Sequence, residues 1–221
     1  MKDAAYKPVY RYAAYLPSEY ARWQGWPLIL YLHGEEERGD DLEMLKTRGL
    51  PSLLEDRLDF PFVVVSPQCP AGEEWSSERL GWLLDDVMVK FWVDPDRIYV
   101  TGVGMGGYAA WRLGIEHPER FAAIAPVSGG GNPQEVCNMR DVPVWAFHGV
   151  WDGDVPVSEL QSVTLALRLC GGNVRSTLYP EEGHECWREA YNDPELYRWF
   201  LEHDRSVYRE PTLDPVMEDL D

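Results

Sequence analysis

The stretch "IYVTGVGMGGYAAW", residues 98–111, passes from an apolar strand pattern through closely spaced glycines into a helical pattern. A strand-to-helix turn of this kind usually reads G-x-S-x-G, and it holds its central side chain exposed above a sheet. Here the pentapeptide at 102–106 reads "GVGMG", so Gly104 stands at the centre. Glycine permits the strained backbone of such a turn and the close packing of the following helix. The stretch therefore predicts a nucleophile elbow that carries no nucleophile.

On either side of this turn, strand patterns alternate with helical patterns. We expect strands at 9–17, 26–34, 60–68, 96–102, 121–129, 141–149 and 174–180. We expect helices at 41–56, with an interruption at 49–51 (Gly-Leu-Pro), and at 76–92, 105–121, 156–172 and 186–203. The alternation predicts an α/β fold with a mostly parallel central sheet and helices on both faces. In such sheets the functional residues lie on loops at the carboxyl ends of the strands.

Composition and charge restrict the class of function. The chain has 221 residues, of which 45% are hydrophobic and 13% aromatic, as in globular enzymes. Its 38 acidic residues against 20 basic ones give a formal charge of -18, which opposes binding to nucleic acid and to anionic membranes. No apolar run is long enough for a membrane span. We expect one domain over 1–203 and an extended acidic tail over 204–221.

The four cysteines are far apart and form no C-x-x-C pair, which argues against a structural zinc site; they are Cys69, Cys137, Cys170 and Cys186. We expect reduced thiols rather than a disulfide. The N-terminal "MKDAAYKPVYRY" has no apolar segment typical of a secretion signal, so the location is left open between cytoplasmic and unknown. We expect no cofactor and no metal ion.

Two ionisable residues follow the last two predicted strands. Asp152 comes directly after the strand at 141–149, and His184 directly after the strand at 174–180. The order elbow, acid, histidine is that of a hydrolase triad. In such a triad the acid fixes the tautomer of the histidine and stabilises its protonated form. We therefore predict that Asp152 and His184 form a catalytic pair beside Gly104.

Five stretches together carry a family resemblance. They are "LYLHGEEERGDD", "VVSPQCP", "DPDRIYVTGVGMGGYAAW", "VWAFHGVWDGDVPV" and "YPEEGHECW". Over roughly residues 10–203 the chain resembles compact, lid-poor esterases of the α/β-hydrolase superfamily, of the dienelactone hydrolase and polyhydroxybutyrate-depolymerase-like kind. The resemblance implies serine-dependent cleavage of carboxylic esters. It also implies an oxyanion hole made by the backbone N–H of Met105 and by one from the loop after His33-Gly34, beginning at Glu35.

The chain departs from the family pattern at two places. Gly104 stands where the family carries its serine. The family loop reads H-G-x-G-E-R-G, whereas residues 33–39 read "HGEEERG", so Glu36 replaces a glycine. A carboxylate beside an oxyanion hole opposes the charge that the hole stabilises. Glu37 and Arg38 match the pattern, and we expect a local ion pair that supports the loop.

Three functions remain open. The first is an esterase scaffold whose serine-dependent activity is lost or very low, by design or in nature. The second is a non-covalent acid/base catalyst that uses Glu35, Glu36 or the His184–Asp152 pair. If either glutamate points into the cleft, desolvation raises its pKa; otherwise both form a solvated face. The third is a ligand-binding protein without chemistry.

Other residues are candidates for smaller roles. Trp151 and Trp75 are candidate walls of a cleft that takes a small ester or a planar aromatic molecule. His33 and His148 are interpreted as structural. Cys186 is a poorly suited substitute nucleophile, because it begins a helix. The assembly is left open between monomer and homodimer.

Overall fold

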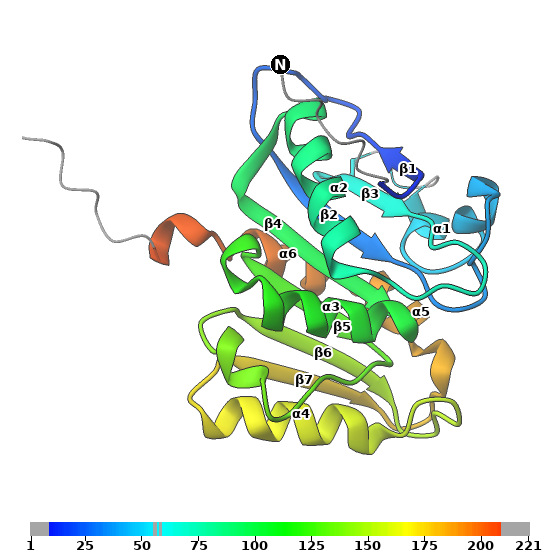
Figure 1. The fold of residues 1–221 in the computed structure, drawn as a ribbon, viewed down its shortest axis with the longest axis vertical. Coiled ribbons are helices and arrows are strands. Elements are labelled where there is room, and N and C mark those ends of the chain that lie inside the picture. The colour runs from blue at the N-terminus through cyan, green and yellow to red at the C-terminus, as the bar shows by residue number, and fades with distance from the viewer. Residues whose placement is uncertain (1–8, 55–56, 58, 209–221) are drawn as a thin grey trace, which may run out of the picture.

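The computed structural model describes residues 9–54, 57 and 59–208 (Figure 1). Its centre is a seven-stranded sheet in the order β1-β3-β2-β4-β5-β6-β7. The strands are β1 (Tyr12–Tyr15), β2 (Trp26–Leu32), β3 (Val63–Pro67), β4 (Val93–Val103), β5 (Ala123–Val127), β6 (Val144–Gly149) and β7 (Val174–Tyr179). Only β1 is antiparallel, in its pairing with β3; every other pairing is parallel. The predicted mostly parallel sheet is confirmed.

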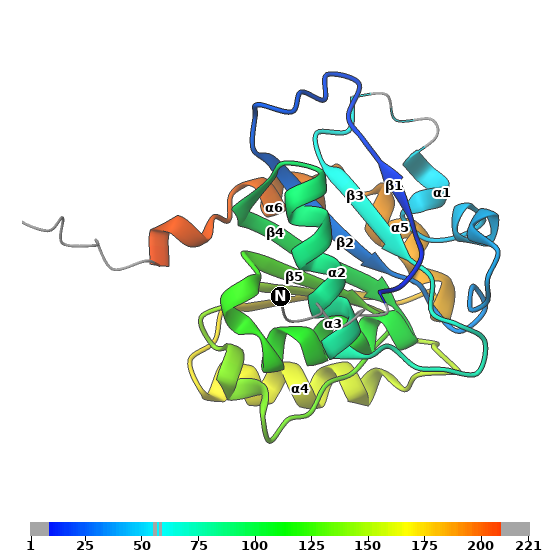
Figure 2. The same ribbon diagram turned by 45° about the horizontal axis from the view of Figure 1, so that its top comes forward.

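Helices cover both faces of the sheet. They are α1 (Pro51–Leu54), α2 (Ser77–Lys90), α3 (Met105–Glu116), α4 (Val157–Leu169), α5 (Trp187–Asn192) and α6 (Pro194–Leu201). Short 3₁₀ segments are η1 (Leu42–Lys46), η2 (Pro118–Arg120), η3 (Val136–Met139), η4 (His184–Cys186) and η5 (Arg205–Tyr208). Helices α2, α3 and α4 lie on one face, and α1, α5 and α6 supply residues to the core on the other (Figures 1 and 2).

The central strands form because their apolar runs are buried on both sides. All residues of β2, β3, β5 and β6 are buried. Along β2, Leu28 and Leu30 pack into the core beneath α2 and α3, whereas Ile29 packs into the opposite core. Alternate side chains of a strand point to opposite faces, so one continuous apolar run serves two cores.

Two predicted helices are interrupted in the structure. Among its described residues, the segment 41–56 forms η1 and α1, with the break at the predicted position: Gly49 has φ +63°, and a side chain there would collide with the hydroxyl of Tyr31. The segment 186–203 divides into η4, α5 and α6. The second break follows from Pro194, which begins α6 after Asp193 has capped it by accepting a hydrogen bond from the N–H of Glu195.

The expectation of four reduced cysteines was wrong for one pair. Cys137 and Cys170 form a disulfide, with 5.8 Å between their Cα atoms. The bond joins η3 to the residue that ends α4, two elements that pack together although 33 residues separate the cysteines. Disulfides are typical of oxidising compartments, so the cysteines do not support a reducing location. Cys69 and Cys186 are free and buried.

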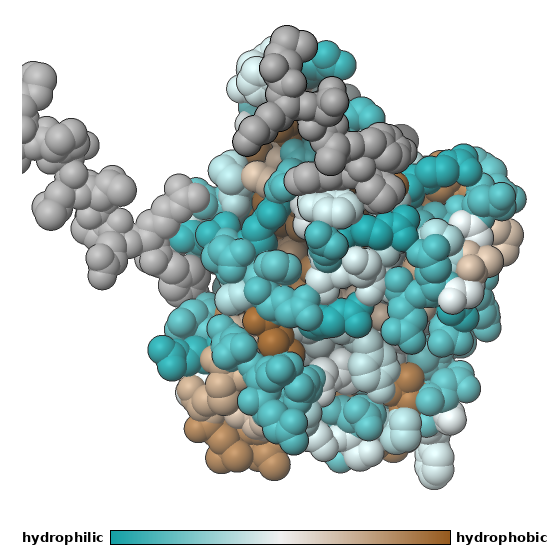
Figure 3. Space-filling model, in the orientation of Figure 1, coloured by the Kyte–Doolittle hydropathy of each residue, from teal (hydrophilic) through white to brown (hydrophobic). Residues whose placement is uncertain are grey.

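Most of the visible face is hydrophilic, and an apolar patch lies over the C-terminal end of α4, where Leu165 and Leu169 are exposed (Figure 3). Of the predicted tail, residues 205–208 form η5, and 209–221 lie outside the described residues. The division into one domain and a tail stays a prediction. Within the described ranges, no helix combines the length and the apolar character that crossing a membrane requires.

Candidate active site

Gly104 occupies the turn between β4 and α3 in a conformation that side-chain-bearing residues rarely adopt. Its backbone has φ +55° and ψ −116°, and its N–H donates to the carbonyl of Val127 at 3.1 Å. Two residues further on, a side chain at Gly106 would collide with the carbonyl of Leu32. The glycine-rich stretch therefore folds as a strained turn with α3 packed closely against β2, and it presents position 104 to the cleft.

Asp152 and His184 meet at the carboxyl ends of β6 and β7. The Nδ1 atom of His184 lies 2.9 Å from Oδ2 and 3.1 Å from Oδ1 of Asp152. The Asp152 carboxylate is buried, and its Oδ1 also accepts from the N–H groups of Asp154 at 3.0 Å and Val155 at 2.8 Å. A carboxylate only accepts hydrogen bonds, so the neutral imidazole carries its proton on Nδ1 and leaves the lone pair on Nε2.

The imidazole of His184 faces Gly104 directly. A Cβ atom placed on Gly104 would lie 2.9 Å from Nε2 and 3.2 Å from Cε1 of His184. The ring therefore already occupies part of the space that a side chain at position 104 requires. A serine at this position would displace the ring by a few tenths of an ångström, and the displaced Nε2 would face the serine hydroxyl.

His148 is a second histidine behind this pair, and sequence reasoning gave it only a structural role. It is fully buried, and its Nε2 lies 2.9 Å from the carbonyl of Val155 and 3.4 Å from Oδ2 of Asp152. Both neighbours are acceptors, so Nε2 carries the proton and His148 supports the Asp152 carboxylate. The four-residue spacing of His148 and Asp152 at a strand end is the signal that could have predicted this contact.

Ser128 holds the turn that carries His184, and sequence reasoning missed it. The residue is buried at the end of β5 with φ +47°, and its Oγ lies 3.3 Å from the carbonyl of His184 and 3.2 Å from Sγ of Cys186. A positive φ is uncommon for serine and stores strain. Burial raises the pKa of Cys186 to about 11. Cys186 is thus a buried thiol packed behind the site.

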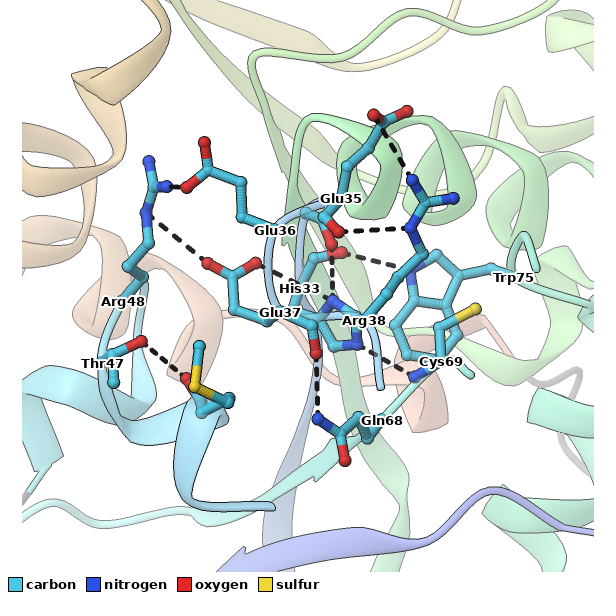
Figure 4. Close-up of polar contacts among 12 residues, drawn as sticks. His33, Glu35, Glu36, Glu37, Arg38, Thr47, Arg48, Gln68, Cys69 and Trp75 are labelled. Atoms are coloured by element: carbon cyan, nitrogen blue, oxygen red, sulfur yellow. Dashed lines mark hydrogen bonds and ion pairs between the residues drawn. The ribbon is translucent and has the colours of Figure 1, made fainter. Parts of the chain in front are cut away.

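His33 is the anchor of the loop after β2, as predicted. Its Nε2 accepts from the N–H of Cys69 at 2.9 Å, so Nδ1 carries the proton and donates to the carbonyl of Gly34 at 2.6 Å (Figure 4). Burial lowers the pKa of His33 to about 4, which keeps the ring neutral. Trp75 donates from its indole N–H to the carbonyl of His33 at 3.2 Å. The loop is therefore fixed by buried neutral contacts.

Glu35 and Glu36 of this loop take the solvated arrangement, one of the two that the sequence left open. The side chains of Glu35 and Glu36 are 72% and 71% exposed; Glu35 pairs with Arg38, and Glu36 with Arg48 (Figure 4). Both carboxylates therefore lie mostly in solvent at the rim of the cleft. The buried acid is Glu37, whose pKa is raised by burial. The expected local pair of Glu37 with Arg38 was wrong.

Arg48 is the partner of Glu37 and the cation that sequence reasoning missed. Its Nε lies 3.5 Å from Oε1 of Glu37, and its other nitrogens contact Glu36 and Glu185. The three carboxylates come from two segments more than a hundred residues apart in the sequence. No local pattern predicts this arrangement, because only the folded chain brings the loop after β2 and the turn η4 to one arginine.

These groups line a single cleft with a volume of about 830 Å³. Its lining residues include Glu35, Glu36, Glu37, Arg48, Trp75, Gly104, Met105, Tyr108, Arg112, Asp154, His184 and Trp187. Trp75 is buried and lines the wall of the cleft, where the sequence analysis placed it. Trp151 is 74% exposed and lies outside the lining that the described residues form, so it is not a wall of this cleft. The buried Trp187 lines it instead.

The two predicted oxyanion donors both belong to residues of the cleft lining. Met105 is the first residue of α3, so its N–H has no acceptor within the helix and stands at the positive end of the helix dipole. Glu35 belongs to the loop after β2 and also lines the cleft. The role of either N–H in stabilising a developing negative charge stays a prediction.

One group of residues has donor atoms placed closely enough for a metal ion. Among the described residues, Asp152, Asp154 and His184 have donor atoms within 4.8 Å of one another. Hydrogen bonds already organise two of them, since Asp152 accepts from His184 and from two backbone N–H groups. The arrangement is that of an acid–histidine pair, and the expectation of no metal stays a prediction.

Comparison with known proteins finds esterases and depolymerases. No family model matches the chain. The Poly(3-hydroxyoctanoate) depolymerase of Pseudomonas fluorescens is 24% identical over 213 residues, which cover 81% of this chain and 74% of that protein. Among solved structures, a thermostable esterase is 30% identical with a TM-score of 0.81, over 88% of this chain and 59% of that one.

Further likenesses extend the same picture. A phospholipase/carboxylesterase from Dyadobacter fermentans DSM 18053 has a TM-score of 0.60 over 88% of this chain and all of that one; at 17% identity it shows the fold alone. Three other curated relatives are 25–29% identical, and the chain spans less than half of the length of each, from 28% to 48%. The predicted fold is confirmed by these likenesses.

Proposed function

We propose that this chain, which belongs to the α/β-hydrolase superfamily and has an esterase scaffold, binds small carboxylic esters in its cleft without serine-dependent turnover. Its substrate class follows from the scaffold and from the wall formed by Trp75 and Trp187. Asp152 and His184 would be the acid and base of the site, and Met105 and Glu35 would supply the oxyanion N–H groups.

The observation that carries this proposal is the geometry at Gly104. Gly104 has the strained backbone of an elbow, and a Cβ atom added to it would lie against Nε2 of His184. All groups that would activate a serine are thus assembled around a position without a hydroxyl. In serine hydrolases, removal of one triad member leaves roughly 10³–10⁴-fold catalysis over water from the oxyanion hole and binding. A small residual rate is the expectation here.

Restoration of the serine tests the proposal. We expect Gly104→Ser to hydrolyse p-nitrophenyl acetate and butyrate with a kcat at least about 10²-fold above that of the unaltered chain. Gly104→Ala is the matched control, because it adds the same Cβ atom without the hydroxyl. If Gly104→Ser folds, as judged by circular dichroism, and gains no more than Gly104→Ala, the esterase assignment fails. Binding of an ester by both chains with turnover in neither would instead favour a ligand-binding protein.

A second candidate is a non-covalent acid/base catalyst. The observation that favours it is the Nε2 of His184, which has no hydrogen-bond partner within the described residues and faces the cleft. Glu35 and Glu36 fit this role less well than His184, since both are exposed and paired with arginines. Elimination of a benzisoxazole by proton abstraction measures this activity. Its loss in His184→Gln, with unchanged rates in Glu35→Gln and Glu36→Gln, would support it.

A further inference from the structure

We infer that His184 itself is the nucleophile of this site, and that its Nε2 accepts the acyl group of esters with good leaving groups. The inference rests on the proposed function in one respect, because the cleft must bind carboxylic esters. It goes beyond that function because it assigns covalent chemistry to a residue that acts only as a base in a serine-dependent site.

The first argument is the position of the imidazole. Nε2 of His184 lies 2.9 Å from the place of a Cβ atom on Gly104, which is shorter than an ordinary van der Waals contact. The ring thus stands in the space of the missing side chain rather than behind it. The next residue, Met105, begins α3, and the N-terminus of a helix stabilises negative charge. When Nε2 attacks the carbonyl carbon of an ester, the carbonyl oxygen would lie near the N-terminus of α3.

The second argument is the electronic state of the ring. Asp152 accepts the Nδ1 proton of His184 at 2.9 Å, which directs the lone pair of the neutral ring to Nε2. The side chain of His184 is 25% exposed, and that of Asp152 is fully buried. A fixed, neutral imidazole with an accessible lone pair is a nucleophile for acyl transfer. The buried carboxylate also stabilises the positive charge that attack creates.

The third argument excludes the other nucleophiles. Within the described residues, the cleft lining contains no serine, threonine or cysteine. Cys186 and Cys69 are buried, and burial raises the pKa of each thiol to about 11, so both are protonated at neutral pH. Ser128 is buried and directs its Oγ toward the turn of His184.

Tyr31 and Tyr108 also line the cleft, but burial raises the pKa of both phenols. The carboxylates of the lining are weaker bases than an imidazole and so weaker nucleophiles toward an ester. His184 therefore carries the strongest nucleophilic atom of this lining.

The chemical step balances with water as the only co-reactant. The Nε2 lone pair adds to the ester carbonyl carbon, and collapse of the adduct breaks the bond to the leaving oxygen, which departs as a phenolate. The product is an acylimidazolium whose Nδ1 proton is shared with Asp152. Water then adds to the acyl carbon and loses one proton to solvent, the carbon–nitrogen bond breaks, and its electron pair returns to Nε2. The carboxylic acid that is released loses its proton to solvent.

This chemistry selects the substrate by its leaving group. A neutral imidazole is expelled from the first adduct more readily than an alkoxide, so an alkyl ester would return to the starting state. A nitrophenolate is expelled as readily as the imidazole or more readily, because its conjugate acid is at least about as acidic as imidazolium, so a nitrophenyl ester would go forward. We therefore expect the unaltered chain to cleave nitrophenyl acetates and to leave ethyl acetate intact.

A partitioning experiment tests the covalent step. The unaltered chain is given p-nitrophenyl acetate and 2,4-dinitrophenyl acetate in turn, with hydroxylamine as a competing acceptor, and the ratio of acetohydroxamate to acetate is measured. A common acetyl-histidine gives the same ratio for both esters. His184→Gln should lose the activity. Gly104→Ala should also lose it, because the added methyl group displaces Nε2. His117→Gln, at the far end of α3, is the control that keeps it.

The results separate this inference from the proposed function. A ratio that changes with the leaving group means direct attack by water or hydroxylamine, and it would overturn the inference. So would an activity that His184→Gln retains, or an unaltered chain no faster than buffer. In each of these cases a gain of turnover in Gly104→Ser still supports the proposed function. Absence of that gain, together with a constant ratio, would overturn the proposed function and leave His184 as the nucleophile.

Discussion

Two regions line the same cleft and are held in place by different kinds of contact. Asp152 is buried, and two backbone N–H groups and His184 bind its carboxylate. Glu35 and Glu36 project from the loop after β2 with most of their side chains in solvent, and only arginine side chains bind them. Buried backbone contacts fix a group before a substrate arrives, whereas exposed ion pairs are weak and rearrange. We therefore assign the chemistry to the first region.

The largest effect is expected when the hydrogen-bonded pair of Asp152 and His184 is broken. In the Gly104→Ser background, Asp152→Asn should lower kcat for p-nitrophenyl acetate about 10⁴-fold, because an amide can donate to Nδ1 and thereby favours the tautomer that protonates Nε2. Steady-state kinetics measure the loss, with Glu36→Gln in the same background as the control at the rim. A loss of less than about tenfold would show that the carboxylate is not the partner on which His184 depends.

The second effect is a pH dependence of stability in the anchor of the loop. The pKa of His33 falls from its ordinary value of 6.5 to about 4 on burial. The folded state thus favours the neutral ring, so the stabilisation is complete above pH 6.5 and is lost as the pH falls toward 4. The loss amounts to about 3 kcal/mol. Urea unfolding between pH 7 and pH 4 should show this slope in the unaltered chain and a flatter one in His33→Gln.

Glu37 opposes this trend, which gives the experiment an internal check. Burial raises its pKa, so its contribution is complete at low pH and is lost as the pH rises through the raised value. Glu37→Gln should therefore make the acid-side loss of stability steeper than in the unaltered chain. If neither His33→Gln nor Glu37→Gln changes how the free energy of unfolding varies with pH, other groups control the stability at low pH.

The third effect tests the residue behind the pair. In the Gly104→Ser background, His148→Gln should lower kcat about 10- to 100-fold with little change in KM, because His148 touches Asp152 and does not reach the cleft. The matched control is His117→Gln, which should leave kcat unchanged. If His148→Gln lowers the free energy of unfolding together with kcat and leaves the pH profile of kcat unchanged, His148 acts only through packing.

The sequence predicted the buried region better than the rim. The parallel sheet, the elbow at Gly104 and the approach of Asp152 to His184 follow from apolar strands whose carboxyl ends meet at one edge. The same reasoning could not foresee Arg48, because its three carboxylate partners come from two distant segments. It also missed the Cys137–Cys170 bond, which joins two segments 33 positions apart in the sequence. Contacts between distant segments leave no periodic trace in the sequence.

The smallest expected effect concerns the rim. In the Gly104→Ser background, Glu36→Gln should change the free energy of unfolding by less than about 1 kcal/mol, because the carboxylate is exposed and its pairing with Arg48 is screened by solvent. Removal of one negative charge near the predicted oxyanion donors should raise kcat by no more than about threefold. Kinetics at low and high salt measure this, since screening should abolish the difference. A gain of 10²-fold that persists at high salt would mean that Glu36 enters the cleft during turnover, and the contrast between the two regions would fail.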